Sequence, residues 1–203
     1  PQVYVERRRA LSENSKLILQ YGILDPFSGE LPPSEYERQP LAGESGRRPA
    51  QAGRIAWQRA AGDRTATLGA GGYWARQDWG FARKVDAWTA TVDWDVHLGR
   101  RFGLTGELYR GRAMAGLGGG AAGSVLFRGS PDSASGTVLP LASAGGWSQL
   151  KFQPVSRLEF NAAFGQDSPY RSGLGRLLAA REVAGASVSR NASGLLNAIY
   201  QIR

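Results

Sequence analysis

The stretch that decides the fold is Trp88–His97, which reads WTATVDWDVH. Trp88 and every second residue after it are apolar, and the residues between them are Thr, Thr, Asp, Asp and His. Side chains of a β-strand alternate between the two faces of a sheet. The stretch therefore predicts a strand with one wholly apolar face and one wholly polar face.

The same alternation recurs along most of the chain, for example in Leu158–Phe164, and helical periodicity is confined to 172–183. Most of the predicted strands reach the ~9–11 residues that a tilted strand needs to cross a bilayer, and they exceed the ~5–6 residues usual in soluble sheets. We predict nine strands, at 3–10, 16–24, 51–60, 64–76, 85–97, 101–113, 143–154, 156–166 and 188–203.

The predicted connections alternate in length. Such a meander, with short turns at one end and long loops at the other, is typical of outer-membrane barrels. A sandwich would show Greek-key connections and shorter strands. Short turns are expected at 12–15, 61–64, 98–101 and 154–156, and long connections at 25–50, 77–84, 114–142 and 167–187.

Composition bounds the class of protein. With 203 residues, 42% of them hydrophobic, the chain suits one folded domain and is too apolar for a disordered tail. It contains no cysteine, which excludes disulfides and thiolate zinc sites. No run of about 18 apolar residues predicts a membrane helix, although spanning strands need none.

The two ends of the chain both look like cuts. The sequence starts at Pro1 without a secretory signal, and it ends at Arg203 within a predicted strand. We therefore expect 1–203 to be a single region of a longer barrel, with the signal peptide removed or outside the fragment.

Several segments resemble porin-like outer-membrane β-barrels of Gram-negative bacteria. They are Gly145–Phe152 (GGWSQLKF), Arg157–Gly165, Gln77–Phe81, and Arg110–Ala113 leading into Gly116–Gly120. The resemblance implies an up-and-down antiparallel transmembrane barrel in the outer membrane, with short periplasmic turns, long outer loops, and membrane lipid or lipopolysaccharide as partners. The chain departs from the family pattern because it lacks a closing strand with a terminal aromatic residue, and nine is an odd number of strands.

In such a barrel, alternate side chains face the lumen and the lipid, because a spanning sheet must pair all its backbone groups by closing on itself. The alternative is that the aromatic residues fill the core of a soluble barrel. The expected lumen-facing residues are Thr89, Thr91, Asp93, Asp95, Glu107, Gln149, Lys151, Glu159 and Asn161. The expected lipid-facing and girdle residues are Trp57, Trp74, Trp88, Trp94, Phe152, Phe160, Phe164 and Tyr200.

The formal net charge of +8 comes mostly from arginine. These basic residues are scattered over turns and loops without interleaved aromatics, so we expect no nucleic-acid binding. Two functional interpretations remain: arginines that contact anionic head groups, and inward-facing Arg110, Arg112 or Lys151 that favour anions in a pore. Ordinary solvated charge accounts for most of them.

Two motifs contain residue types that bind nucleotides or catalyse reactions in other proteins. Gly118-x-Gly120-x-x-Gly123 matches a dinucleotide fingerprint in spelling, but no helix or acidic partner follows it. We instead expect Gly116, Gly118, Gly120 and Gly123 to lie in a loop that folds into the lumen and narrows it.

Asp93, Asp95 and His97 share the polar face at alternate positions and are the best catalytic candidates. Lumenal carboxylates paired with arginine are the simpler interpretation, and the spacing is poor for a metal site. We therefore predict no enzyme activity, no metal site and no cofactor.

The sequence thus predicts a porin-like channel for passive diffusion of small hydrophilic solutes, with selectivity set by lumenal charge. A non-conducting structural or adhesion barrel is one alternative, since an eight-stranded interior is filled by side chains. A soluble ligand-binding β-barrel is the other.

Overall fold

The computed structural model describes residues 2–30, 40–119, 123–169 and 190–202, and nearly all regular structure in them is β. The predicted helix at 172–183 lies outside these residues. The two short helices are α1 (Ala42–Ser45) and the 3₁₀ turn η1 (Ala115–Leu117). The strands are β1 (Gln2–Ser12), β2 (Ser15–Leu24), β3 (Ala50–Ala61), β4 (Arg64–Asp78), β5 (Lys84–Leu98), β6 (Phe102–Arg112), β7 (Val125–Arg128), β8 (Thr137–Pro140), β9 (Ala142–Val155), β10 (Leu158–Pro169) and β11 (Asn191–Tyr200).

Nine of these strands form one antiparallel sheet in which neighbours in space are neighbours in the chain. Its order is β1-β2-β3-β4-β5-β6-β9-β10-β11, interrupted only by the separate β7–β8 hairpin. The prediction of nine antiparallel strands in a meander is confirmed. The strands β7 and β8 were not predicted, because their Gly- and Ser-rich surroundings show no alternation.

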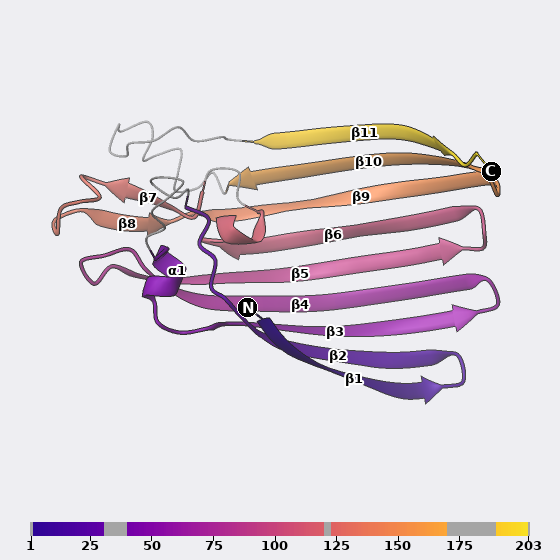
Figure 1. The fold of residues 1–203 in the computed structure, drawn as a ribbon, viewed down its shortest axis with the longest axis horizontal. Helices are drawn as coiled ribbons and strands as arrows, with labels where there is room; N and C mark the ends of the chain where they lie inside the picture. The colour runs from indigo at the N-terminus through magenta and orange to yellow at the C-terminus, as the bar shows by residue number, and fades with distance from the viewer. Residues whose placement is uncertain (1, 31–39, 120–122, 170–189, 203) are drawn as a thin grey trace.

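The connections separate into two ends of the sheet (Figure 1). At one end, here called the turn end, short turns join β1 to β2, β3 to β4, β5 to β6 and β9 to β10. At the other, the loop end, lie α1, η1 and the β7–β8 hairpin. The connection predicted at 77–84 is shorter than expected, since β4 reaches Asp78 and β5 begins at Lys84.

Glycine shapes two of the tight turns at the turn end. Gly62 and Gly99 have φ values of 61° and 76°, in the left-handed region where a side chain would strain the backbone. The β3–β4 hairpin pairs Ala61 with Arg64 and therefore has a two-residue loop.

Within the described residues the sheet is open and does not close into a barrel. β1 pairs only with β2, and β11 pairs only with β10. An odd number of antiparallel strands leaves the two edge strands running in the same direction, so these edges cannot pair antiparallel with each other. The expected barrel is thus seen only as an open antiparallel sheet.

The buried core is small and lies at the loop end. Its fully enclosed members are Ala50, Ala75, Val85, Ala87 and Ala113, with Leu24, Tyr73, Trp79, Val125 and Val138 packed against them. Small alanines allow the loops to approach the sheet closely, so the core joins the sheet to its loops.

Candidate functional site

The strand register places all nine residues predicted to face a lumen on one side of the sheet, here called the polar face. Directly opposite residues on paired strands point to the same side. Asp93 is opposite Glu107, Thr105 opposite Gln149, and Asn161 opposite Lys151. The full set is Thr89, Thr91, Asp93, Asp95, Glu107, Gln149, Lys151, Glu159 and Asn161.

The residues predicted to face lipid lie on the other side, here called the apolar face. Trp74 is opposite Trp88, and the Phe152 ring stacks on that of Phe160 with centroids 6.4 Å apart. Phe164 and Tyr200 are 58% and 62% exposed. The full set is Trp57, Trp74, Trp88, Trp94, Phe152, Phe160, Phe164 and Tyr200.

At the centre of the polar face, Arg54 of β3 reaches across β4 to Asp93 of β5. Its Nε lies 2.9 Å from Asp93 Oδ2, and its Nη2 contacts Oδ1. Gly69 of β4 makes this possible, because a Cβ there would collide with both charged groups. A missing side chain on the middle strand thus lets a bidentate ion pair form between strands that are not neighbours.

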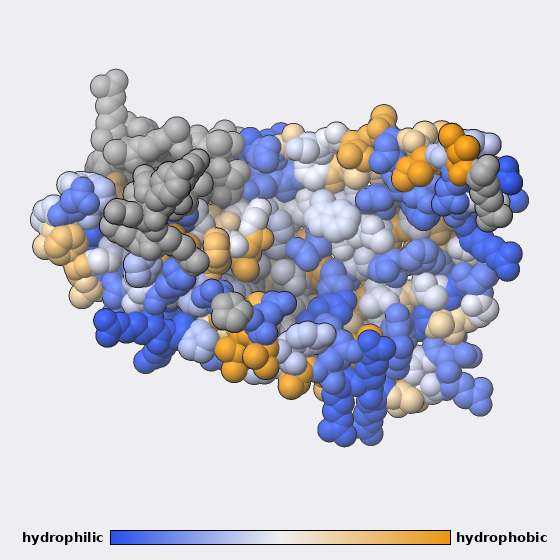
Figure 2. Space-filling view, in the orientation of Figure 1, coloured by the Kyte–Doolittle hydropathy of each residue, from blue (hydrophilic) through white to orange (hydrophobic). Residues whose placement is uncertain are grey.

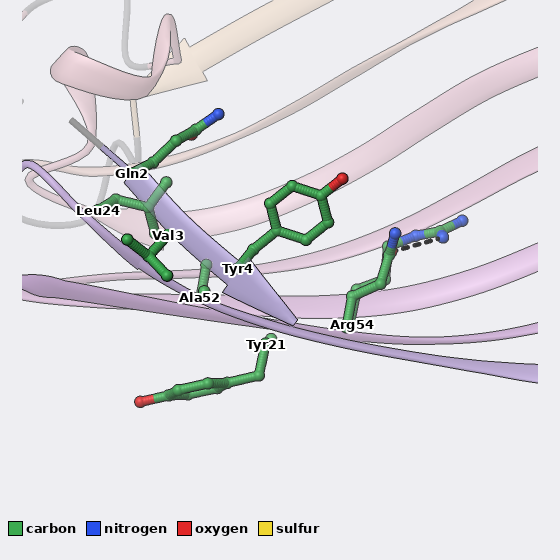
Figure 3. Close-up of a pocket in the computed structure, with 10 residues that line it drawn as sticks. Gln2, Val3, Tyr4, Tyr21, Leu24, Ala52 and Arg54 are labelled. Atoms are coloured by element: carbon green, nitrogen blue, oxygen red, sulfur yellow. Dashed lines mark hydrogen bonds between the residues drawn. The ribbon is translucent and has the colours of Figure 1, made fainter. Parts of the chain in front are cut away.

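This ion pair continues toward the β1 edge. Arg54 Nη1 donates to Gln20 Oε1 at 3.2 Å, and Gln20 Nε2 donates to Glu6 Oε2 at 2.7 Å. Figure 3 shows Arg54 and Tyr4 rising on one side of the strands while Tyr21 points to the other. Polar side chains therefore connect β1, β2, β3 and β5 along one face.

A second polar network covers β9 to β11. Lys151 Nζ lies 2.5 Å from Glu159 Oε2, and the amide of Asn161 donates to Glu159 Oε1 and to Asn197 Oδ1 at 3.0 Å each. Gln149 donates to Asn161 Oδ1 at 2.9 Å. Asn161 is 5% exposed and fully hydrogen-bonded, as a buried amide requires.

The prediction that Arg110 and Arg112 face inward is wrong. Arg110 is opposite Ala90, and Arg112 is opposite Trp88, which puts both on the apolar face. The alternation of Leu104, Gly106 and Leu108 on β6, continued to Arg110 and Arg112, gives this same face. Lys151, which does lie on the polar face, is paired with Glu159.

The best catalytic candidates of the sequence are not brought into one cluster. His97 Nδ1 lies 3.2 Å from Asp95 Oδ1, near the turn end, whereas Asp93 is engaged by Arg54. Among the residues that the structure describes, no group of three or more His, Asp or Glu side chains is placed to hold a metal ion.

Two loops lie over one face of the sheet at the loop end (Figure 1), and the Thr89 hydroxyl donates to Met114 Sδ at 3.9 Å, which identifies this face as the polar one. Ser28 Oγ accepts a hydrogen bond from Gly43 N at 2.7 Å, and the Ser28 carbonyl accepts one from Ser124 Oγ at 2.7 Å. The Ala115 amide donates to Ser124 Oγ at 3.2 Å. These bonds join the segment after β2 to the segment after β6, and together the two form what we call the loop cover (residues 25–30, 41–46 and 113–124, as far as described).

The glycines predicted to form a constriction have different surroundings. Gly116 touches the other loop so closely that a Cβ would collide with the carbonyl of Phe27. Gly118 and Gly123 have φ values of 81° and 93° and open space around them, and Gly120 lies outside the described residues. The loop thus packs against the segment 25–30, a contact that was not predicted, and its predicted role as a constriction stays a prediction.

Sequence reasoning also missed Arg83, in the turn between β4 and β5. A guanidinium has five N–H donors, and each of those on Arg83 meets a backbone carbonyl at 2.6–3.4 Å. The Arg83 guanidinium also lies 5.1 Å and 5.3 Å from the ring centres of Phe81 and Phe127. The acceptors are the carbonyls of Trp79, Gly80, Pro131, Ser133 and Gly136. Every residue has a backbone carbonyl, so no residue pattern could have revealed this set of contacts, here called the Arg83 clamp.

The space-filling view shows hydrophilic and neutral side chains over the middle of the sheet, with hydrophobic side chains near the C-terminal strands (Figure 2). No helix in the described residues is long and apolar enough to cross a membrane. No protein-family model, curated protein or solved structure matches the chain.

Proposed function

We propose that this sheet is part of the wall of a porin-like outer-membrane β-barrel that lets small hydrophilic solutes diffuse through a water-filled lumen. The observation that carries the proposal is that apolar and polar side chains lie largely on opposite faces of a nine-stranded meander, most clearly on β5. Large apolar side chains stand exposed on one face, among them Leu68, Val92 and Leu108 at 50%, 53% and 56%. Such a surface in water would favour aggregation, whereas lipid accommodates it.

The dimensions of the apolar face support this proposal. On β5 the uncharged surface runs from Trp88 to Leu98. At ~3.4 Å per residue this is about 34 Å along the strand, or about 26 Å after a tilt of ~40°. Outer-membrane barrels carry an apolar band about 25 Å tall. On β4 and β5, charged groups mark the limits of this band, with Arg64 at the turn end and Arg76 paired to Asp86 at the loop end, whereas Arg110 of β6 lies within it, opposite Ala90.

The loop cover supports a narrowed lumen. It crosses the polar face at one end only, while the Arg54–Asp93 pair and the Lys151–Glu159 pair lie beyond it along the strands. A solute would pass the loop cover first and the charged wall next, so size is selected before charge.

A non-conducting barrel is the second candidate, and the loop cover is the observation that favours it. The buried core beneath it, of four alanines and Val85, joins the loop cover to the sheet through Ala113. A small closed barrel plugged in this way would anchor or adhere without conducting.

The decisive experiment is a labelling scan along β5 in the full-length gene product, refolded in detergent and reconstituted in vesicles. The chain has no cysteine, so single Cys variants need no altered background. Spin labels at Ala90 and Val92 should collide with membrane-dissolved oxygen, and a label at Thr91 should collide with a water-soluble nickel complex.

A soluble barrel would give the opposite result at Ala90 and Val92, namely protection from both reagents. If the membrane pattern is found, conductance across a planar bilayer then separates a channel from a non-conducting barrel. Retarded gel mobility of the boiled sample relative to the unboiled one provides an independent check that a closed barrel has formed.

A further inference from the structure

At the turn end, three arginines surround one open groove. The groove has a volume of about 470 Å³ and lies between the β3–β4 turn and the β5–β6 turn. One carboxylate, that of Asp63, also faces it. Its lining consists of Asp63, Arg64, Leu98, Gly99, Arg100, Arg101 and Phe102.

The side chains of Arg64, Arg100 and Arg101 make no hydrogen bond or ion pair with any other group in the described part of the chain. All three are exposed. A guanidinium presents five donors in a planar fork, so three free forks in one groove leave many donors for a partner outside the chain.

The same groove adjoins the apolar face. Leu98 and Phe102 are opposite each other at the end of β5 and β6, and they are 62% and 44% exposed. Phe102 stacks on Phe152 with ring centroids 4.8 Å apart, which continues the apolar surface onto β9. The groove therefore joins a cationic rim to a surface suited to acyl chains.

We propose that this groove binds the phosphate of an anionic membrane phospholipid, with its acyl chains lying against Leu98 and Phe102. The inference rests on the proposed membrane location. Guanidinium forks match phosphate oxygens in bidentate geometry, and three guanidiniums against one carboxylate leave the groove cationic. Only a ligand with an anionic head and an apolar tail satisfies both parts of the surface.

The test measures which lipid gathers near the groove. Leu104→Cys, on the apolar face and outside the groove, carries a fluorophore, and the labelled full-length protein is reconstituted in phosphatidylcholine vesicles. Brominated phosphatidylglycerol and brominated phosphatidylcholine are then titrated separately as quenchers over the same range of mole fractions. Each basic residue near a membrane surface strengthens binding of an anionic lipid about fivefold, so phosphatidylglycerol should quench at a several-fold lower mole fraction.

The paired variant Arg100→Gln with Arg101→Gln should remove most of this preference. The matched control is Arg47→Gln with Arg48→Gln, two adjacent exposed arginines outside the turn end, which changes the net charge equally and should leave the preference intact. Equal quenching by both lipids, or an equal loss in the control, would overturn the groove while leaving the membrane location standing. Quenching by neither lipid would overturn both.

Discussion

The two ends of the sheet use arginine in opposite ways. At the loop end, Arg76 is paired with Asp86 at 2.6 Å, Arg112 donates twice to the Asp86 carbonyl, and Arg83 makes five bonds to carbonyls. At the turn end, the side chains of Arg64, Arg100 and Arg101 make none within the described residues. The three loop-end arginines named here hold the protein together, whereas the three at the turn end are available to bind a partner.

The largest effect of replacing an arginine is expected at the loop end, at Arg83. Arg83→Ala would remove five hydrogen bonds, three of which join the β7–β8 hairpin to the β4–β5 turn, while the other two lie within that turn. Since a hydrogen bond to a charged group contributes ~1.5–3 kcal/mol and such terms do not add fully, we expect about 3 kcal/mol of local destabilisation. Hydrogen exchange of the hairpin amides would measure it.

Arg83→Lys is the matched variant for this experiment. A lysine keeps the charge but places its donors on a single atom, so it cannot reach carbonyls on both loops. Full protection of the hairpin in Arg83→Lys would mean that charge alone holds it, contrary to the clamp.

The next largest effect is expected at Gly116, where the two loops touch. Gly116→Ala would push a Cβ into the backbone carbonyl of Phe27, and overpacking of this kind costs about 1–3 kcal/mol. We expect faster proteolysis within the loop cover and, in a channel, a larger conductance. Gly118→Ala is the comparison: its φ of 81° also strains an alanine, but nothing lies within 4 Å of the new carbon. An equal effect of both substitutions on conductance would argue against contact between the loops.

An intermediate effect is expected midway between the two ends, at Asp93. Asp93→Ala would leave the guanidinium of Arg54 without its carboxylate, in a setting where the two side chains are only 30% and 23% exposed. We expect a loss of about 2 kcal/mol in the free energy of unfolding, from urea titration in lipid or detergent. The double variant with Arg54→Ala should cost less than the sum of the two single changes, and strict additivity would show that the pair does not interact.

The smallest effect is expected at the turn end. Arg100→Gln with Arg101→Gln breaks no bond within the described chain, so the free energy of unfolding in detergent should change by less than about 0.5 kcal/mol. A large loss in detergent would mean that these arginines stabilise the protein itself, and the contrast between the two ends would disappear.

Much of the sheet could be predicted because alternation is a local property. The alternation in WTATVDWDVH shows which side chains of β5 share a face. The pairing of β4 and β6 with β5 places their alternating residues on the same two faces. Strand ends were placed within a few residues, although β10 begins at Leu158 where 156 was expected. The inward placement of Arg110 and Arg112 ran against the alternation of β6, because Leu104 and Leu108 share their face with both arginines.

The parts that could not be predicted depend on contacts between distant residues. The Arg54–Asp93 pair needs a register in which Gly69 falls between them, and a sequence does not display register across three strands. The loop cover depends on Ser28 meeting Ser124, which lie 96 residues apart. Arg64, Arg100 and Arg101 look like scattered charge in the sequence, because the β3–β4 and β5–β6 turns become neighbours only in the folded sheet.

The clamp around Arg83 also differs from the polar face in its response to salt. Its acceptors are all backbone carbonyls, which carry no net charge. The Arg54–Asp93 and Lys151–Glu159 pairs, in contrast, each join two opposite charges, and dissolved ions screen that attraction. High salt should therefore weaken the contacts between strands on the polar face while the β7–β8 hairpin at the loop end stays in place.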